Sequence, residues 1–85
     1  MNNQPGSIAV KEAERARWRC RRGLLELDVV LRRFMDLHYA RLSRAELQQF
    51  ETLLNLPDND LWDIIAREKE ADGNVQPVLR LLQSV

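Results

Sequence analysis

Hydrophobic positions recur at helical spacing along most of the chain. A first helix is predicted over about 9–20, with a narrow stripe of small residues formed by Ala9, Ala13, Ala16 and Cys20. A second is predicted over about 24–40, with a broad apolar face formed by Leu27, Val30, Leu31, Phe34 and Leu37. No stretch shows the sustained apolar–polar alternation of a half-buried strand. The pattern therefore predicts helices and no sheet.

Three shorter helices are predicted in the second half of the chain. Ser43 and Glu46 have the spacing of a capping box, and the helix that follows turns Leu47, Phe50 and Leu54 inward. Pro57 stops the chain, and Asp58 or Asp60 is placed to cap a fourth helix that carries Leu61, Ile64 and Ile65.

The fourth helix is expected to end at residues 71–74, where Gly73 is free to adopt the left-handed conformation. A last short helix, with Pro77 in its first turn, places Val78, Leu79 and Leu82 on one side. About five helices with short connections indicate an all-α bundle. The polar residues 1–7 are expected to form a flexible N-terminal tail, and residues 8–85 a single helical domain.

The composition limits the cellular environment and the kinds of partner that we expect for this chain. The single cysteine allows no internal disulfide, and no apolar run approaches the about 20 residues of a membrane span, so membrane insertion is not expected. No secretory signal is visible at the N-terminus, and a cytoplasmic location is expected. The chain is expected to be a monomer, although its small-residue stripe is equally suited to a dimer contact.

Charge argues against nucleic acid as a partner. The chain has 13 basic and 13 acidic residues, whereas nucleic-acid binders are clearly basic. The cluster "RARWRCRR" at 15–22 places arginines around the whole helix, and acidic residues lie on either side of it. A solvated helix face is therefore favoured over an RNA-binding or membrane-binding surface.

Catalytic chemistry has little support in the sequence. No Ser/His/Asp arrangement, phosphate-binding glycine loop or metal-ligand cluster is present. Glu26 and Asp28 would lie about 200° apart on a helix and cannot act on one bond together. The arginines around Cys20 would lower the pKa of its thiol, but its place on the small-residue stripe favours a packed thiol. We therefore expect no enzyme, no metal site and no tightly bound cofactor.

The segment "CRRGLLELD" at 20–28 contains a glycine that has two explanations. Gly23 can serve as a helix N-cap, with Glu26 as the third helical residue reaching back to free backbone N–H groups. Alternatively, the helix extends back to Arg22, which then shares a face with Glu26 beside bare backbone that a partner can approach closely. The residues alone leave both explanations open.

Several motifs together resemble one family. "WRCRRGLLELD", followed by Phe34, Tyr39 and "LPDNDLWDII", resembles the SdhE family of flavinylation factors, also described as YgfY or CptB and related to a mitochondrial succinate dehydrogenase assembly factor. The resemblance extends from about Ala13 to Gln83. Its most specific part is an Arg-Gly-x-x-Glu motif, formed here by Arg22, Gly23 and Glu26.

The resemblance implies a five-helix assembly factor that binds the flavoprotein subunit of succinate dehydrogenase or fumarate reductase. Such a factor promotes covalent attachment of FAD to a histidine of that subunit, so the FAD is on the partner. Arg22, Gly23 and Glu26 are implied as the partner-contact surface, and matching neighbouring positions are Trp18, Arg21, Asp28 and Tyr39. On this interpretation Gly23 is a docking notch. The alternative is an antitoxin-like regulatory protein that acts on a membrane or cytoskeletal partner, as the name CptB suggests.

Overall fold

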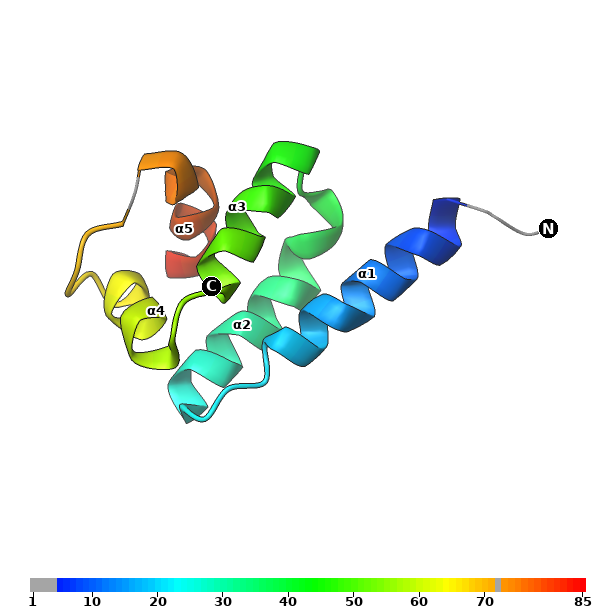
Figure 1. Cartoon of the computed structure of the whole chain (residues 1–85). Coiled ribbons are helices and arrows are strands. Elements are labelled where there is room, and N and C mark those ends of the chain that lie inside the picture. Colours follow the sequence, from blue (N-terminus) through cyan, green and yellow to red (C-terminus); the bar gives the residue numbers. More distant parts are fainter. Residues whose placement is uncertain (1–4, 72) are drawn as a thin grey trace.

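A computed structural model describes residues 5–71 and 73–85 of the chain, with side chains described from residue 10 onward. Within these ranges the structure has no strand, which confirms the all-α prediction (Figure 1). The described residues form five α-helices and two 3₁₀ turns: α1 (Pro5–Arg19), α2 (Leu25–Leu37), η1 (Tyr39–Arg41), α3 (Arg44–Leu54), α4 (Asp58–Ile65), η2 (Gly73–Val75) and α5 (Gln76–Gln83).

Helices α2 to α5 enclose the hydrophobic core. Phe34 of α2 and Phe50 of α3 meet at its centre, with ring centroids 4.6 Å apart. Every helix of this group contributes to the set of fully buried side chains, which comprises Phe34, Phe50, Leu27, Leu31, Leu53, Leu61, Leu82 and Val78. The helical periodicity predicts most of this interior, but in α3 Leu53 is buried in addition and Leu47, which was expected to be buried, is only partly so.

Helix α1 lies outside this group and projects from the bundle, so the molecule measures 48 × 26 × 20 Å (Figure 1). Of its described side chains only Ala16 is buried, and Cys20 is buried directly after the helix ends. Two polar contacts hold its last turns: Arg17 bonds Asp36 of α2 at 2.8 Å, and Arg19 bonds Asn55 at 2.5 Å. Ala9 of the predicted stripe has no described side chain.

Two predicted helix boundaries differ from the structure. Helix α1 begins at Pro5 and not near residue 9, while residues 1–4 of the expected tail lie outside the described residues. The second helix ends at Leu37 and continues as η1. Leu37 was expected in the core but is 58% exposed, because it comes ten residues after Leu27 and is rotated by about 80° from the core direction.

The capping box of the third helix is confirmed. The Glu46 N–H donates to the Ser43 hydroxyl at 3.1 Å, and the Ser43 N–H donates to the Glu46 carboxylate at 2.8 Å. Each side chain satisfies a backbone donor that the first helical turn leaves free. Pro77 lies in the first turn of α5 as predicted.

Both ends of the fourth helix differ from the prediction. Its N-cap is Pro57, and no side chain caps it, since Asp58 is already helical and its carboxylate bonds elsewhere. The helix ends at Ile65 through a Schellman motif, with Arg67 in the left-handed region at φ 67°. The expectation that Gly73 would adopt this conformation is wrong: Gly73 lies in η2 and its φ is not positive.

Candidate partner-binding site

Arg22 fixes the segment between α1 and α2 to the junction of α3 and α4. Its side chain is only 12% exposed. The guanidinium donates to the carbonyl oxygens of Leu54 at 2.6 Å and Leu56 at 3.1 Å, to the Asp58 carboxylate at 3.0 Å and to the carbonyl of Arg19 at 2.9 Å. Arg22 is therefore held inside the structure and does not project toward solvent.

Asp58 completes this anchor from the first turn of α4. One carboxylate oxygen accepts from Arg22, and the other accepts the backbone N–H of Gly23 at 3.0 Å. The hydrogen bond from Arg22, followed by that from the Gly23 N–H, holds the pKa of the Asp58 carboxyl below its ordinary value of 3.8. Residues 22 and 23 are thus clamped by one carboxylate that comes from 35 positions away in the chain.

Both sequence-based explanations of Gly23 as part of a helix are wrong. Helix α2 begins at Leu25, and its N-cap is Leu24, which makes no side-chain cap. Arg22 therefore precedes the helix and does not share a face with Glu26. The Glu26 side chain is exposed in the first turn of α2 and has no hydrogen bond or ion pair with another described residue.

Gly23 is exposed, and nothing in the fold requires a glycine there. A Cβ at this position would meet only the Asp58 carboxylate oxygen, at an ordinary contact distance of 3.5 Å. Its φ is not positive, so the backbone conformation is open to other residues as well. The missing side chain leaves accessible backbone on the surface of an anchored segment.

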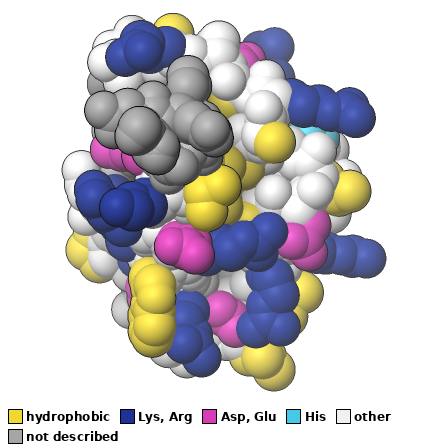
Figure 2. All heavy atoms as spheres, turned by 90° about the vertical axis from the view of Figure 1, so that its right-hand side faces the viewer, with side chains coloured by type: hydrophobic (Ala, Val, Ile, Leu, Met, Phe, Trp, Pro, Cys, Tyr) yellow, Lys and Arg dark blue, Asp and Glu magenta, His cyan; other side chains and the backbone are white. Residues whose placement is uncertain are grey.

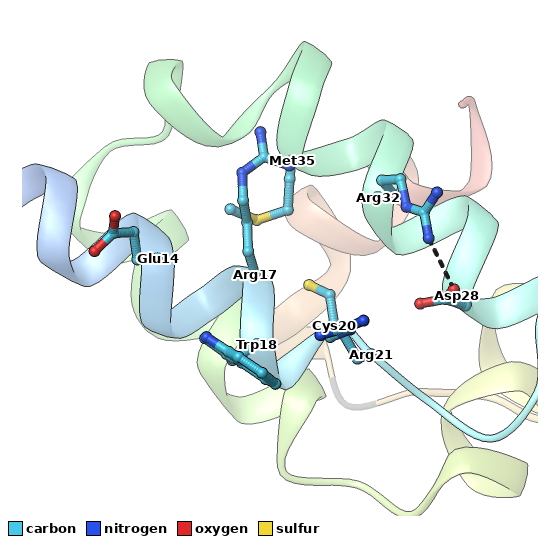
Figure 3. A pocket seen from close by; sticks show the side chains of 8 residues that line it. All are labelled: Glu14, Arg17, Trp18, Cys20, Arg21, Asp28, Arg32 and Met35. Atoms are coloured by element: carbon cyan, nitrogen blue, oxygen red, sulfur yellow. Dashed lines mark hydrogen bonds and ion pairs between the residues drawn. The ribbon is translucent and has the colours of Figure 1, made fainter.

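A groove of about 600 Å³ lies beside this segment, between α1 and α2 (Figure 3). It is lined by Glu14, Arg17, Trp18, Cys20, Arg21, Asp28, Arg32 and Met35. Glu14 and the lining residues three, four and seven positions after it share one face, and Cys20, at i+6, comes directly after α1 ends. Three of the predicted contact residues, Trp18, Arg21 and Asp28, are brought together in this groove, which we call the α1–α2 groove.

Cys20 lies on the floor of the α1–α2 groove as a packed thiol, as expected. It is buried, and burial raises the pKa of its thiol to about 11 despite the opposing charges of Arg22, Arg17 and Arg19. A thiol with this pKa stays protonated at neutral pH. The arginine-activated nucleophile is therefore not present.

Tyr39 is not brought to the same place. It lines a smaller cavity of about 200 Å³ on the opposite flank of α1, against α3. The residues of α1 on that flank are Glu12, Arg15, Ala16 and Arg19, which again follow the i, i+3, i+4, i+7 spacing. Tyr39 packs edge-on against Phe50 at 6.0 Å, and burial raises the pKa of its hydroxyl.

The structure adds surface residues that the sequence analysis did not single out. Leu25 is 73% exposed and Val29 44% exposed, one turn apart on the outer face of α2. The sequence does contain a signal for this pair, because two apolar residues stand at i and i+4 on the side of the helix opposite the core stripe. No sequence signal links Asp58 to residues 22 and 23. On the face from which α1 projects, acidic and basic side chains alternate with hydrophobic ones (Figure 2).

The described residues contain no group of three or more metal-ligating side chains. No described helix is both long enough and apolar enough to span a bilayer. What the site offers is accessible backbone, an exposed tryptophan and several arginines and carboxylates. Such an arrangement is typical of a protein-binding module.

The chain belongs to the Sdh5 family, described as the flavinator of succinate dehydrogenase, whose profile matches residues 14–85. It is 42% identical over 76 residues to the FAD assembly factor SdhE of Ralstonia nicotianae, covering 84% of this chain and 80% of the relative. It is 41% identical over 65 residues to SdhE of Aliivibrio fischeri, covering 76% of each chain. These matches confirm the resemblance found in the sequence.

A more distant relative is the FAD assembly factor SdhE of Coxiella burnetii, 32% identical over 74 residues that cover 86% of this chain and 90% of the relative. No solved structure matches the chain at a significant level. The family and its relatives are assembly factors and not catalysts. They give no support to the antitoxin-like alternative.

Proposed function

We propose that this chain binds the flavoprotein subunit of succinate dehydrogenase, or of the related fumarate reductase, and promotes covalent FAD attachment to it. Family membership supports the partner and the outcome. The FAD belongs to the partner, where the bond to the protein forms. A cytoplasmic site of action and a monomeric free state stay predictions.

The observation that carries the proposed contact surface is Gly23. Its exposure, its ordinary φ and the room for a Cβ leave no internal reason for glycine at this position. Close approach of another polypeptide supplies a reason, because a side chain here would stand between the two backbones. Glu26, exposed and without a described partner, offers a carboxylate beside this backbone.

The other predicted contact residues take different roles in this proposal. Arg22 acts as a positioning residue, since its guanidinium is used in anchoring the segment. Trp18, Arg21 and Asp28 extend the surface into the α1–α2 groove. Contact through Tyr39, on the other flank of α1, stays a prediction outside this surface.

A protein without its own reactive groups promotes such a reaction by selective binding. Formation of the flavin–histidine bond requires the two reacting atoms to be held together, and charge that develops on the flavin to be stabilised. A factor that binds the reactive conformation of the flavoprotein more tightly raises its population. The increase is limited by the difference between its affinities for the two conformations.

The direct test is Gly23→Leu, with the flavoprotein subunit co-expressed. We expect normal helicity by circular dichroism and loss of covalent flavin fluorescence from the flavoprotein band on a denaturing gel. Gly73→Leu is the matched control, because Gly73 is also exposed and a Cβ there would meet nothing within 4 Å. We expect this control to support normal flavinylation.

Normal flavinylation with a stably folded Gly23→Leu variant would overturn the proposed surface but not the proposed function. Deletion of the gene tests the function itself. If protein-bound flavin on the succinate dehydrogenase subunit is unchanged without this chain, the chain is not needed for its flavinylation and the proposal fails.

A further inference from the structure

The three arginines of the α1–α2 groove differ in what they bind. Arg17 is paired with Asp36 at 2.8 Å, and Arg32 is paired with Asp28 at 3.1 Å. Arg21 has no ion pair with any described carboxylate, and its guanidinium instead lies over the Trp18 ring, 4.9 Å from the centroid. It is the groove arginine whose charge is not neutralised by a described carboxylate.

Stacking on Trp18 leaves the hydrogen-bonding edge of Arg21 available. A guanidinium contacts an aromatic ring through its flat face, while its N–H donors lie in its own plane and point sideways. The ring holds the group in place and so reduces the entropy lost when it binds a ligand. This geometry is suited to a carboxylate, which accepts two parallel N–H bonds from one guanidinium.

The remaining lining of the groove supplies an apolar surface. Trp18 is 69% exposed although Arg21 lies over its ring. Cys20 and Met35, both buried, approach each other from the two sides of the groove and form its floor (Figure 3). Glu14 lies further along α1, away from Arg21, and the other carboxylate of the lining, Asp28, is bonded to Arg32 (Figure 3).

We propose, building on the proposed function, that the α1–α2 groove binds a segment of the flavoprotein that carries an aspartate or glutamate beside a bulky apolar side chain. The carboxylate accepts hydrogen bonds from Arg21, and the apolar side chain packs on Trp18 above Cys20 and Met35. Leu25 and Val29, exposed on the neighbouring face of α2, continue this apolar contact toward Gly23.

Charge and continuity favour this occupant. Arg17 and Arg32 are each paired with a carboxylate, so Arg21 is the arginine of the lining that is left to bind an acid. The groove also adjoins the anchored segment with Gly23, so one polypeptide can follow both. The other occupants that the groove chemistry admits are free FAD, through its phosphates, and a second copy of this chain.

The test measures the environment of the Trp18 ring and the affinity for the flavoprotein in the same titration. The chain is labelled with 5-fluorotryptophan and titrated with the purified flavoprotein subunit, observed by ¹⁹F NMR. The resonances of the two tryptophans are assigned with Trp62→Phe. We expect the Trp18 resonance to shift and to lose its solvent isotope effect, because the ring becomes buried in the complex.

Substitutions at Arg21 test the carboxylate. We expect Arg21→Gln to weaken flavoprotein binding about tenfold, the effect of losing a charge-assisted hydrogen bond, and Arg21→Lys to retain part of the affinity. Binding by Arg21→Gln should also depend less on salt concentration than binding by the natural chain. Arg80→Gln, the same change at an exposed position of α5, is the control and should bind normally.

The outcomes separate this inference from the proposed function. If the flavoprotein binds while the Trp18 resonance stays unchanged, or if Arg21→Gln binds normally, the groove assignment is wrong and the proposed function stands. If the natural chain does not bind the flavoprotein, the groove assignment and the proposed function are both wrong. A shift of Trp18 with free FAD alone, or with increasing concentration of the chain alone, identifies one of the other occupants and overturns the proposal.

Discussion

The bundle of α2 to α5 and the helix α1 are built on different principles. The bundle surrounds two stacked phenylalanines and a continuous set of buried aliphatic side chains. Helix α1 buries one alanine along its described length and is attached through arginines, with open cavities on both flanks. Hydrophobic burial therefore stabilises the bundle, whereas α1 and the segment after it present charge, an exposed ring and bare backbone.

Under the proposed function, this difference would separate stability from recognition in an 85-residue chain. Substitutions in the bundle core are expected to change the free energy of unfolding, and those on α1 the affinity for a partner. Arg22 lies between the two regions, since it belongs to the proposed contact segment but bonds the carbonyls of α3 and the loop after it. This separation can be tested by comparing the free energy of unfolding of variants in the bundle core with that of matched variants at exposed positions.

The largest effect is expected at the centre of the bundle. Phe34→Ala removes a fully buried ring and should lower the free energy of unfolding by about 3–5 kcal/mol, which is enough to unfold many small domains. Urea denaturation followed by circular dichroism measures this. Leu37→Ala on the same helix is the control: its exposed side chain should cost at most about 0.5 kcal/mol. Equal losses in the two variants would contradict the assignment of the core.

Arg22→Ala should have the next largest effect. It removes the bonds to two carbonyls and to Asp58 from a nearly buried position, so we expect a loss of about 1.5–3 kcal/mol in the free energy of unfolding. Arg21→Ala, one residue earlier and exposed, should change it by at most about 1 kcal/mol. If thermal denaturation shows Arg22→Ala to be as stable as Arg21→Ala, the anchor contributes little.

A smaller effect is expected in acid. The pKa of Asp58 is lowered in the folded state, so its stabilising contribution is present above about pH 3.8 and is lost as the pH falls through the lowered value. Asp58→Asn removes this contribution and should narrow the difference between stability at neutral pH and in acid. The prediction is tested by measuring the urea midpoint of unfolding from neutral pH into acid for the natural chain and for the Asp58→Asn variant. Identical pH profiles would exclude Asp58 as a source of the acid sensitivity.

The smallest effect is expected on α1. Arg17→Gln breaks an ion pair with Asp36 in which both side chains are about half exposed, so it should cost at most about 1 kcal/mol. The loss should shrink further in high salt, because screening weakens exposed charges. A loss as large as that of Arg22→Ala, measured by the same urea titration, would show that α1 is as firmly integrated as the bundle.

Local signals in the sequence predicted the fold well. The Ser43–Glu46 capping box and the early proline of α5 depend on residues within one turn, and both are present. Two predictions failed for different reasons: Leu37 lies to one side of the buried stripe of α2, and Gly73 is not at the place where α4 stops. At Arg67 the Schellman hydrogen bonds outweighed the usual preference for glycine.

The site was predicted only as a set of residues and not as a geometry. The family resemblance marked Arg22, Gly23 and Glu26, whereas their spacing alone allowed either a helix cap or a shared helix face. Asp58, which lies 36 positions after Arg22, decides where that guanidinium points, and no local pattern encodes such a contact. Trp18 and Arg21 meet because they are three positions apart where α1 ends, and the Arg21 N–H still donates to the Trp18 carbonyl at 3.1 Å, so a helical pattern already approximates their contact.

The clamp on residues 22 and 23 has a consequence for genetics. Because the Asp58 side chain bonds both Arg22 and the backbone of Gly23, a substitution at Asp58 should loosen this segment although it lies in another helix; the other two bonds go to backbone carbonyls, which a change of side chain leaves in place. A selection for lost flavin attachment should therefore recover changes at Asp58 as well as in the segment itself. Such mutants would report the loss of the anchor, so they are not by themselves evidence of a direct contact with the flavoprotein.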